Sequence, residues 1–166
     1  MSNVNPRRRL LATISLLGSA TAAVATTGRD KPAATAAKAE RFPGDPPEHK
    51  LVYQLNHADP EYIEHILNSV GAMIGKYQDN IALVVVVFGP GIHLLAKAPK
   101  RPIPAELRER VRSQSRDYGV KFIACGNTMK TVGWTAKDMV DFAQVEEVGA
   151  AAMMELQEQG YAYIAW

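Results

Sequence analysis

The chain has 166 residues, of which 47% are hydrophobic, so it can bury one core of ordinary size and we expect a single folded domain. The formal net charge is +2, but Arg7, Arg8 and Arg9 supply three positive charges, and the remainder carries a net charge of −1. A nearly neutral body with few aromatic residues argues against nucleic acid as a partner. The single cysteine excludes an intrachain disulfide and leaves one free thiol.

Residues 1–25 have the organisation of an export signal. The basic start RRR is followed by an apolar run over residues 10–17 and by small residues up to Ala25. The stretch RRRLL resembles the twin-arginine pattern, and residues 23–25 offer a cleavage site. The apolar region is about 16 residues long and diluted by Thr, Ser and Gly, whereas a membrane span needs about 20. We therefore predict a twin-arginine signal peptide cleaved near Ala25, a periplasmic location and no stable membrane span.

The next segment, residues 26–48, is rich in Ala, Thr, Lys and Pro and lacks a periodicity that would bury one face. It predicts a disordered linker, followed by a folded domain over residues 49–166. Residues 51–55 form the first strand, after which Asp59 and Pro60 open a helix as N-cap and first helical residue. Its continuous apolar face carries Ile63, Ile66, Leu67, Val70, Met73 and Ile74.

The clearest strand is residues 81–88, IALVVVVF, which are nearly all apolar and β-branched. Such a run is typical of a central parallel strand covered on both faces. The residues Gly89-Pro90-Gly91 end it, and residues 92–95 predict one short helical turn. Another helix begins at Pro104 and ends at Gly119. The inner side of this helix is expected to carry Leu107, Val111 and Tyr118.

The segment 120–129, VKFIACGNTM, runs a buried strand into the cysteine. Cys125 falls where the strand stops. Gly126, Asn127 and Thr128 follow, and these residue types favour turns and bond the local backbone. The thiol is therefore expected on a strand-to-loop corner, at the edge of a parallel sheet where ligand sites gather.

The remaining elements complete an alternating α/β order. Residues 135–138 resemble a capping box that starts a brief helix through Phe142. Residues 144–148 fit either a short strand or a continuation of that helix, residues 149–159 a helix, and residues 161–166 a last strand. The order predicts an α/β three-layer sandwich, flavodoxin-like, with a mostly parallel sheet of about five strands.

Three side chains are expected at one rim of this sheet: His57, His93 and Cys125 each follow or end a parallel strand. A neighbouring imidazolium or a helix N-terminus would lower the pKa of the thiol and favour a sulfur nucleophile. The alternative is a buried, inert cysteine, with the histidines exposed or hydrogen-bonded in structural roles.

The sequence predicts no cofactor and no metal. The turn after the first strand, LNHADP, lacks the glycines of a dinucleotide-binding loop, and Gly89-Pro90-Gly91 is too short to replace it. The spacing of the cysteine and histidines matches no compact ligand motif for zinc or copper.

Four motifs occur in a characteristic order: NHAD after the first strand, FGPGIHLL after the second, GVKFIACGNTM around the cysteine, and LQEQGYAYI near the end. From about Lys50 to Trp166 the chain resembles the DsrE/DsrF-like family of small α/β sulfur-relay and sulfur-oxidation proteins. The resemblance implies that Cys125 is a sulfur carrier whose thiolate accepts a sulfane sulfur as a persulfide. It also implies a homo-oligomer, a trimer or hexamer, with a sulfur donor or acceptor protein as partner.

Two functions follow from these observations. The first is a periplasmic sulfur carrier in which Cys125 forms the persulfide, supported by the turn of Gly126, Asn127 and Thr128. The second is a non-catalytic oligomeric module that binds a small ligand in a rim pocket. A thiol redox protein is disfavoured because there is no second cysteine to resolve a mixed disulfide.

Overall fold

A computed structural model describes residues 40–166 of the chain. The predicted signal peptide, its cleavage near Ala25 and the linker as far as residue 39 lie outside the described residues. Within residues 40–166, no helix combines the length and apolar character that crossing a membrane requires.

Five strands form one sheet in the order β4-β3-β2-β1-β5, and every neighbouring pair is parallel. The predicted parallel α/β fold is therefore confirmed. Residues 144–146 are a strand, because they pair with the end of the cysteine strand. The strands are β1 (His49–Leu55), β2 (Ile81–Val87), β3 (Lys121–Cys125), β4 (Gln144–Glu146) and β5 (Ala162–Ile164).

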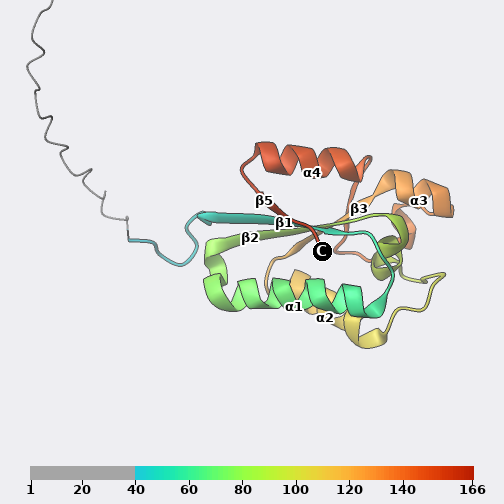
Figure 1. The fold of residues 1–166 in the computed structure, drawn as a ribbon, viewed down its shortest axis with the longest axis horizontal. Helices are drawn as coiled ribbons and strands as arrows, with labels where there is room; N and C mark the ends of the chain where they lie inside the picture. The colour runs from blue at the N-terminus through green and yellow to red at the C-terminus, as the bar shows by residue number, and fades with distance from the viewer. Residues whose placement is uncertain (1–39) are drawn as a thin grey trace, which may run out of the picture. The chain divides into compact units, whose positions relative to one another are not determined.

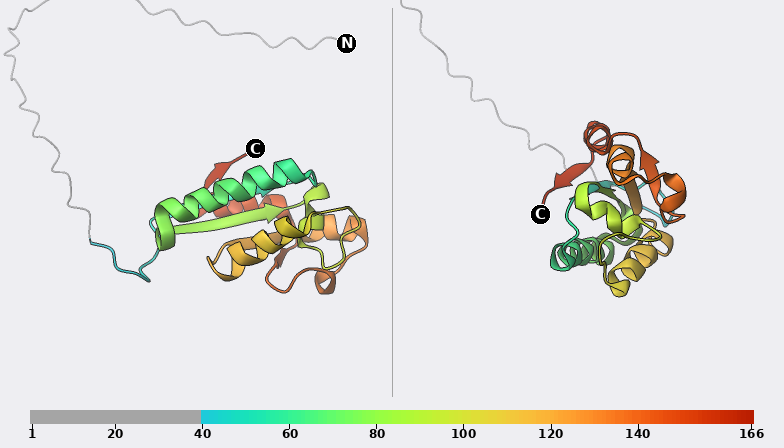
Figure 2. Two further views of the ribbon diagram at one scale, coloured as in Figure 1. Left: turned by 90° about the horizontal axis from the view of Figure 1, so that it is seen from below. Right: turned by 90° about the vertical axis from the view of Figure 1, so that its right-hand side faces the viewer.

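Helices cover both faces of the sheet, which gives the three layers that the sequence predicts. Figure 1 shows α1 (Pro60–Tyr77) and α2 (Ala105–Arg116) below the sheet and α4 (Gly149–Glu158) above it. The end view in Figure 2 shows the same arrangement. The shorter helices are α3 (Gly126–Val132) and three 3-10 segments, η1 (Gln78–Asn80), η2 (Gly89–Leu95) and η3 (Ala136–Asp138).

The central strand β2 contributes to the cores on both faces. Val85 and Val87 pack in the core under α1 and α2, whereas Val84 and Val86 pack under α4. Side chains alternate between the faces of a strand, so a strand buried on both sides needs apolar residues at consecutive positions. Burial of each valine side chain stabilises the fold by about 1.5–3 kcal/mol.

The helix α1 begins as the sequence predicts. The Asp59 carboxylate accepts the backbone N–H of Tyr62 at 2.9 Å, and Pro60 is the first helical residue. Four of the six predicted apolar positions are buried, and Met73 and Ile74 pack partly buried at the edge of the core. This packing fixes the turn that contains His57 against the carboxyl end of β1.

The prediction for the end of α2 was wrong at Tyr118, which is 61% exposed. The helix ends at Arg116, and Gly119 then adopts a positive φ of 70°, so the chain leaves the helix before Tyr118 reaches the core. Gln114 occupies an inner position instead, where its amide donates to the Leu67 carbonyl at 2.8 Å.

Two short helices also differ from the predictions. The turn expected over residues 92–95 starts earlier, because the residues Gly89-Pro90-Gly91 are themselves part of η2. The helix expected through Phe142 stops as η3 at Asp138, although its capping box forms as predicted. Met139 is extended and bridges Ala96, which ends the helix.

Contacts of the domain extend N-terminal to His49. Arg41 forms an ion pair with Asp79 at 2.9 Å, and the backbone N–H of Glu48 donates to the Asn80 side chain at 2.8 Å. Residues 40–48, which the sequence assigns to the linker, therefore contact η1. These contacts are polar, so hydrophobic periodicity does not reveal them.

Gly91 sets how closely η2 packs on the end of β1. A Cβ atom at this position would lie 2.6 Å from Leu55 Cδ2 and 2.7 Å from the Leu55 carbonyl oxygen. We predict that Gly91→Ala lowers the free energy of unfolding by about 1–3 kcal/mol, measured by urea denaturation, because η2 must move outward. Gly75→Ala is the control.

A Cβ atom at Gly75, within α1, meets nothing within 4 Å outside the local helix. Gly75→Ala is therefore expected to raise stability by roughly 0.5–1 kcal/mol, because alanine favours the helix. Equal effects of the two substitutions would contradict the close packing at Gly91.

Candidate functional site

Cys125 is the last residue of β3 and the N-cap of α3. The structure therefore corrects the expected strand-to-loop corner, because a helix begins directly at Gly126. A Cβ atom on Gly126 would lie 3.2 Å from both the Glu146 carbonyl oxygen and Glu147 Cα. Its absence lets α3 start against the connection between β4 and α4. The Asn127 N–H donates to the Glu147 carbonyl at 2.9 Å and holds the two segments together.

The thiol lies between the N-termini of two helices. Cys125 is only 6% exposed, and its Sγ accepts a hydrogen bond of 3.2 Å from the backbone N–H of Gly149, the first residue of α4. A Cβ atom on Gly149 would lie 2.9 Å from Cys125 Cβ and 3.3 Å from Sγ, so glycine permits this approach. N–H groups in the first turn of a helix lack intrahelical partners and favour a negative charge.

Two opposing effects set the pKa of the Cys125 thiol. Burial, the largest single effect, raises it. Four hydrogen-bond donors lower the pKa, and together they outweigh burial. In decreasing order of effect they are the backbone N–H of Thr128, the N–H of Gly149, the Thr128 hydroxyl and the N–H of Asn127. The pKa of Cys125 therefore lies below its usual value, which increases the thiolate fraction at neutral pH.

His93 is buried and has a structural contact rather than a bond to the thiol. Its Nδ1 accepts the backbone N–H of Lys100 at 3.1 Å, and its ring packs edge-on against Trp134 with centroids 5.0 Å apart. Burial, followed by the charges of Arg101 and Lys100, lowers the pKa of His93. The imidazole is therefore neutral at neutral pH and holds the loop that contains Lys100 and Arg101.

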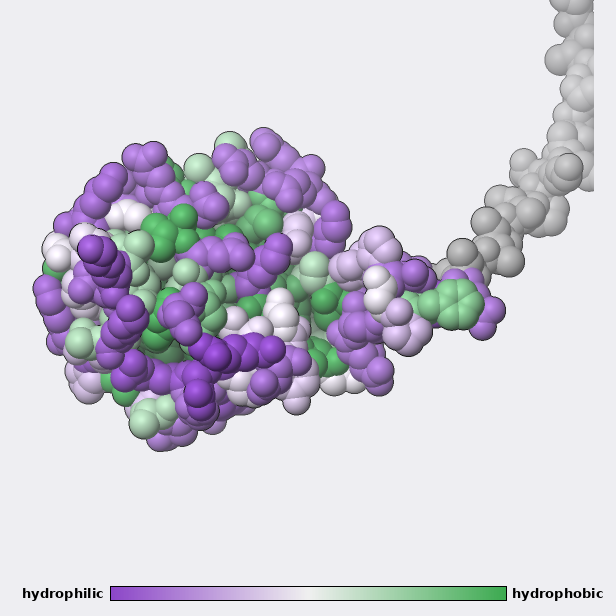
Figure 3. All heavy atoms as spheres, turned by 180° about the vertical axis from the view of Figure 1, so that it is seen from behind, coloured by the Kyte–Doolittle hydropathy of each residue, from purple (hydrophilic) through white to green (hydrophobic). Residues whose placement is uncertain are grey.

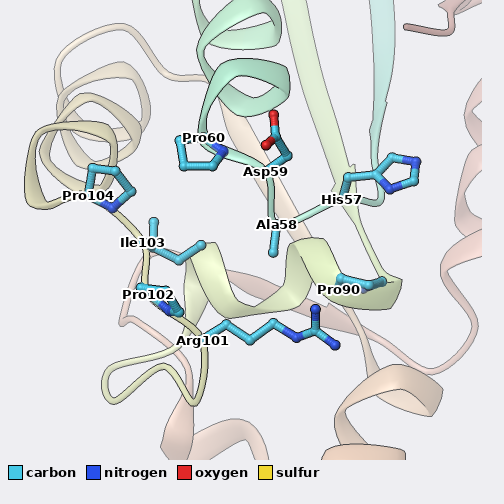
Figure 4. Close-up of a pocket in the computed structure, with 9 residues that line it drawn as sticks. All are labelled: His57, Ala58, Asp59, Pro60, Pro90, Arg101, Pro102, Ile103 and Pro104. Carbon is cyan, nitrogen blue, oxygen red and sulfur yellow. The ribbon is translucent and has the colours of Figure 1, made fainter.

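His57 is exposed at the same rim. Its ring contacts the edge of Tyr62, with centroids 5.0 Å apart, and in Figure 4 it points away from Arg101. Neither histidine is among the groups that hydrogen-bond the sulfur within residues 40–166. The topology brings His57, His93 and Cys125 to one rim, while helix amides supply the polar environment of the thiol.

Two cavities open at this rim. The first, of about 700 Å³, is called the proline pocket (Figure 4). It is lined by His57, Ala58, Asp59, Pro60, Pro90, Arg101, Pro102, Ile103 and Pro104. The second, of about 410 Å³, is called the rim groove and lies beside the first turn of α3. Both include Pro90 and Arg101. The rim groove is lined by Gly89, Pro90, His93, Arg101, Asn127, Thr128, Thr131 and Val132.

Thr128 connects the thiol with the rim groove. It lines the groove, it lowers the pKa of the thiol, and its hydroxyl accepts the backbone N–H of Gly89 at 3.2 Å. Within residues 40–166, no three or more His, Cys, Asp or Glu side chains form a cluster that could hold a metal ion. Thr128 therefore belongs both to the surroundings of the thiol and to the wall of the rim groove.

The sequence predicts neither Gly149 nor Arg101 as a residue of this site. Gly149 is the direct donor to the sulfur, and its position at a helix start after a strand of the same sheet is the signal that identifies it. Arg101 lies in a loop of no regular periodicity, and no sequence pattern predicts its place between the two cavities.

Residues 45–166 match the family described as DsrE/DsrF-like. The chain belongs to the DsrE/DsrF-like family. Within the family, the single cysteine of this member is the residue at the end of β3. No curated protein matches the chain.

Solved structures with the same fold agree with this assignment. MTH1491, a protein of unknown function from Methanobacterium thermoautotrophicum, is 19% identical, with a TM-score of 0.64 over 72% of this chain and 100% of that chain. The ychN protein from E. coli is 12% identical, with a TM-score of 0.60 over 71% of this chain and 99% of that chain. At these identities the similarity shows the DsrE-like fold.

We predict that Thr128→Val raises the pKa of Cys125 and slows alkylation by iodoacetamide at pH 7 several-fold, because the thiolate loses a hydroxyl donor. The rate of alkylation measured against pH gives the pKa. Thr131→Val is the control, because it makes the same chemical change at a hydroxyl that donates to the Thr128 carbonyl, at 2.7 Å, and not to the sulfur.

The same substitution has a consequence for stability. A thiol whose pKa is lower in the folded than in the unfolded chain makes the free energy of unfolding rise as pH increases between the two pKa values. This rise is expected to be smaller in Thr128→Val than in the wild type. If the rate of alkylation by iodoacetamide depends on pH in the same way in the wild type and in Thr128→Val, the role of Thr128 is contradicted.

Proposed function

We propose that this chain is an exported sulfur carrier in which Cys125 accepts a sulfane sulfur as a persulfide. The observation that carries the proposal is the Cys125 thiol between two helix N-termini, with a lowered pKa, in a member of the DsrE/DsrF-like family. The family indicates a function related to sulfur relay. The persulfide and the periplasmic location are the parts that experiment must test.

The loading step is nucleophilic. The Cys125 thiolate attacks a terminal sulfur atom of a polysulfide, the S–S bond next to that atom breaks, and the polysulfide, shorter by one sulfur, leaves with the bonding electron pair. The product is the Cys125 persulfide anion. The backbone N–H groups of Thr128, Gly149 and Asn127 favour a negative charge before and after this step.

A second function is a ligand-binding module whose thiol does not react. Two observations favour it: Cys125 is only 6% exposed, and the rim holds cavities of about 410 and 700 Å³. In that case Cys125→Ser is expected to leave ligand binding unchanged.

The proposal includes two kinds of interaction. The chain forms a homo-oligomer, which is a trimer or hexamer, and it exchanges sulfur with a partner protein that donates or accepts it. Apolar side chains exposed on the described domain support these interactions, and Figure 3 shows hydrophobic atoms between hydrophilic ones on one face. A monomer in sedimentation velocity at micromolar concentration would contradict the oligomer. The large apolar side chains exposed on β4, on α4 and its N-cap, and in the C-terminal segment are Val145, Val148, Met154, Tyr163, Ile164 and Trp166.

Intact-mass spectrometry after incubation with polysulfide tests the carrier. We predict a gain of about 32 Da on the wild type that dithiothreitol reverses, and no gain on Cys125→Ser. Gly149→Ala is expected to load more slowly, because its Cβ crowds the sulfur. An unmodified wild-type thiol that also alkylates slowly would favour the binding module.

Cell fractionation tests export. We predict that the wild-type chain is recovered in the periplasm in a shortened form, and that replacing Arg7, Arg8 and Arg9 by lysine leaves the full-length chain in the cytoplasm. The outcome that contradicts export is a full-length wild-type chain confined to the cytoplasm.

A further inference from the structure

The first turn of α3 faces both the thiol and the rim groove. Thr128 and Asn127 lower the pKa of Cys125, and both residues also line the groove. The groove therefore begins two residues from the proposed nucleophile. A small molecule held there lies beside the part of the chain that stabilises the thiolate.

The rim groove has a positive charge and no acidic side chain. Arg101 and His93 are its titratable lining residues, and the lowered pKa of His93 leaves Arg101 as the charged one at neutral pH. Arg101 and His93 line the same groove, so the guanidinium charge acts on the imidazole. A cationic groove without carboxylates favours an anion.

Arg101 differs from the other cations at this rim because its guanidinium has no hydrogen-bond or ion-pair partner within residues 40–166. The Lys97 Nζ donates to the Lys137 carbonyl at 2.8 Å, and the Lys100 Nζ donates to the Val132 carbonyl at 2.7 Å. Lys130 lies 3.5 Å from Glu147. The donors of Arg101 are therefore free to bind a ligand.

The position of Arg101 suits this role. Figure 4 shows its side chain extending toward Pro90 of η2, the residue that the rim groove and the proline pocket share. The side-chain amide of Asn127, which also lines the rim groove, has no hydrogen-bond partner among the described residues either. A planar guanidinium and an amide suit the oxygen atoms of an oxyanion.

We propose that the rim groove binds the oxyanion group of a small sulfane-sulfur donor, with Arg101 and Asn127 as its binding residues. The inference rests on the proposed carrier function and names its substrate class, of which thiosulfate is the simplest member. The Cys125 thiolate attacks the outer sulfur of thiosulfate, and the S–S bond of the donor breaks. Sulfite leaves with the bonding electron pair, and Cys125 becomes a persulfide anion. Arg101 stabilises the charge that moves onto the leaving sulfite.

The test compares wild type, Arg101→Gln and Lys137→Gln. Lys137 is an exposed cation outside both cavities, so its substitution makes the same change in net charge without altering their lining. The rate of persulfide formation with thiosulfate is measured by intact mass and by sulfite release. Alkylation by iodoacetamide, which is neutral, reports the reactivity of the thiol itself.

Arg101→Gln is expected to slow loading from thiosulfate by about tenfold or more, because a charge-assisted interaction is lost. Its alkylation rate and thermal unfolding should match the wild type. Lys137→Gln should keep both rates. A parallel loss of loading and alkylation in Arg101→Gln, or no loss of either, would overturn the subsite.

Two further results separate this inference from the carrier function. Loading by polysulfide, with neither loading by thiosulfate nor binding of thiosulfate, keeps the carrier and rejects the subsite. In the Cys125→Ser background, which forms no persulfide, isothermal titration calorimetry with thiosulfate measures binding alone. Binding that Arg101→Gln abolishes supports the subsite even if no sulfur is transferred, whereas no binding to Cys125→Ser contradicts it.

Discussion

The hydrogen bond from the Gly149 N–H to the Cys125 sulfur, 3.2 Å long, is the contact on which the site depends. It joins the end of β3 to the start of the helix that covers the second face of the sheet. The pairing of Cys125 with Glu146 in β4 brings the two ends together, and the absence of a side chain at Gly149 lets them touch. The geometry of the thiol is therefore a result of the parallel sheet itself.

Burial and helix amides act against each other at this sulfur. Removing the thiol from water disfavours the thiolate, but the N–H groups from α3 and α4, together with the Thr128 hydroxyl, more than compensate, so the net effect favours the anion. A fixed set of backbone donors does not titrate, unlike an imidazolium. The buried, neutral His93 is thus better suited to hold the loop with Arg101 than to activate the thiol.

The sequence predicts the fold well because the signals are strong. The run of valines in β2, the N-cap at Asp59 and the apolar stripe of α1 each have one physical interpretation. The site is only partly predictable. Parallel topology places Cys125 and both histidines at one rim, but the contact with Gly149 depends on the packing of α4, and the place of Arg101 depends on a loop. The sequence predicts a turn at Gly126 and Asn127, because their helix is short and begins directly after a strand.

The most direct test of a persulfide on Cys125 is cyanolysis of the chain after loading with polysulfide and removal of the excess. Cyanide takes the outer sulfur of a persulfide as thiocyanate and restores the thiolate. A persulfide on Cys125 predicts stoichiometric thiocyanate from the wild type, recovery of a thiol that loads again, and no thiocyanate from Cys125→Ser. A wild-type chain that releases no thiocyanate, or equal release from Cys125→Ser, would contradict a persulfide on Cys125.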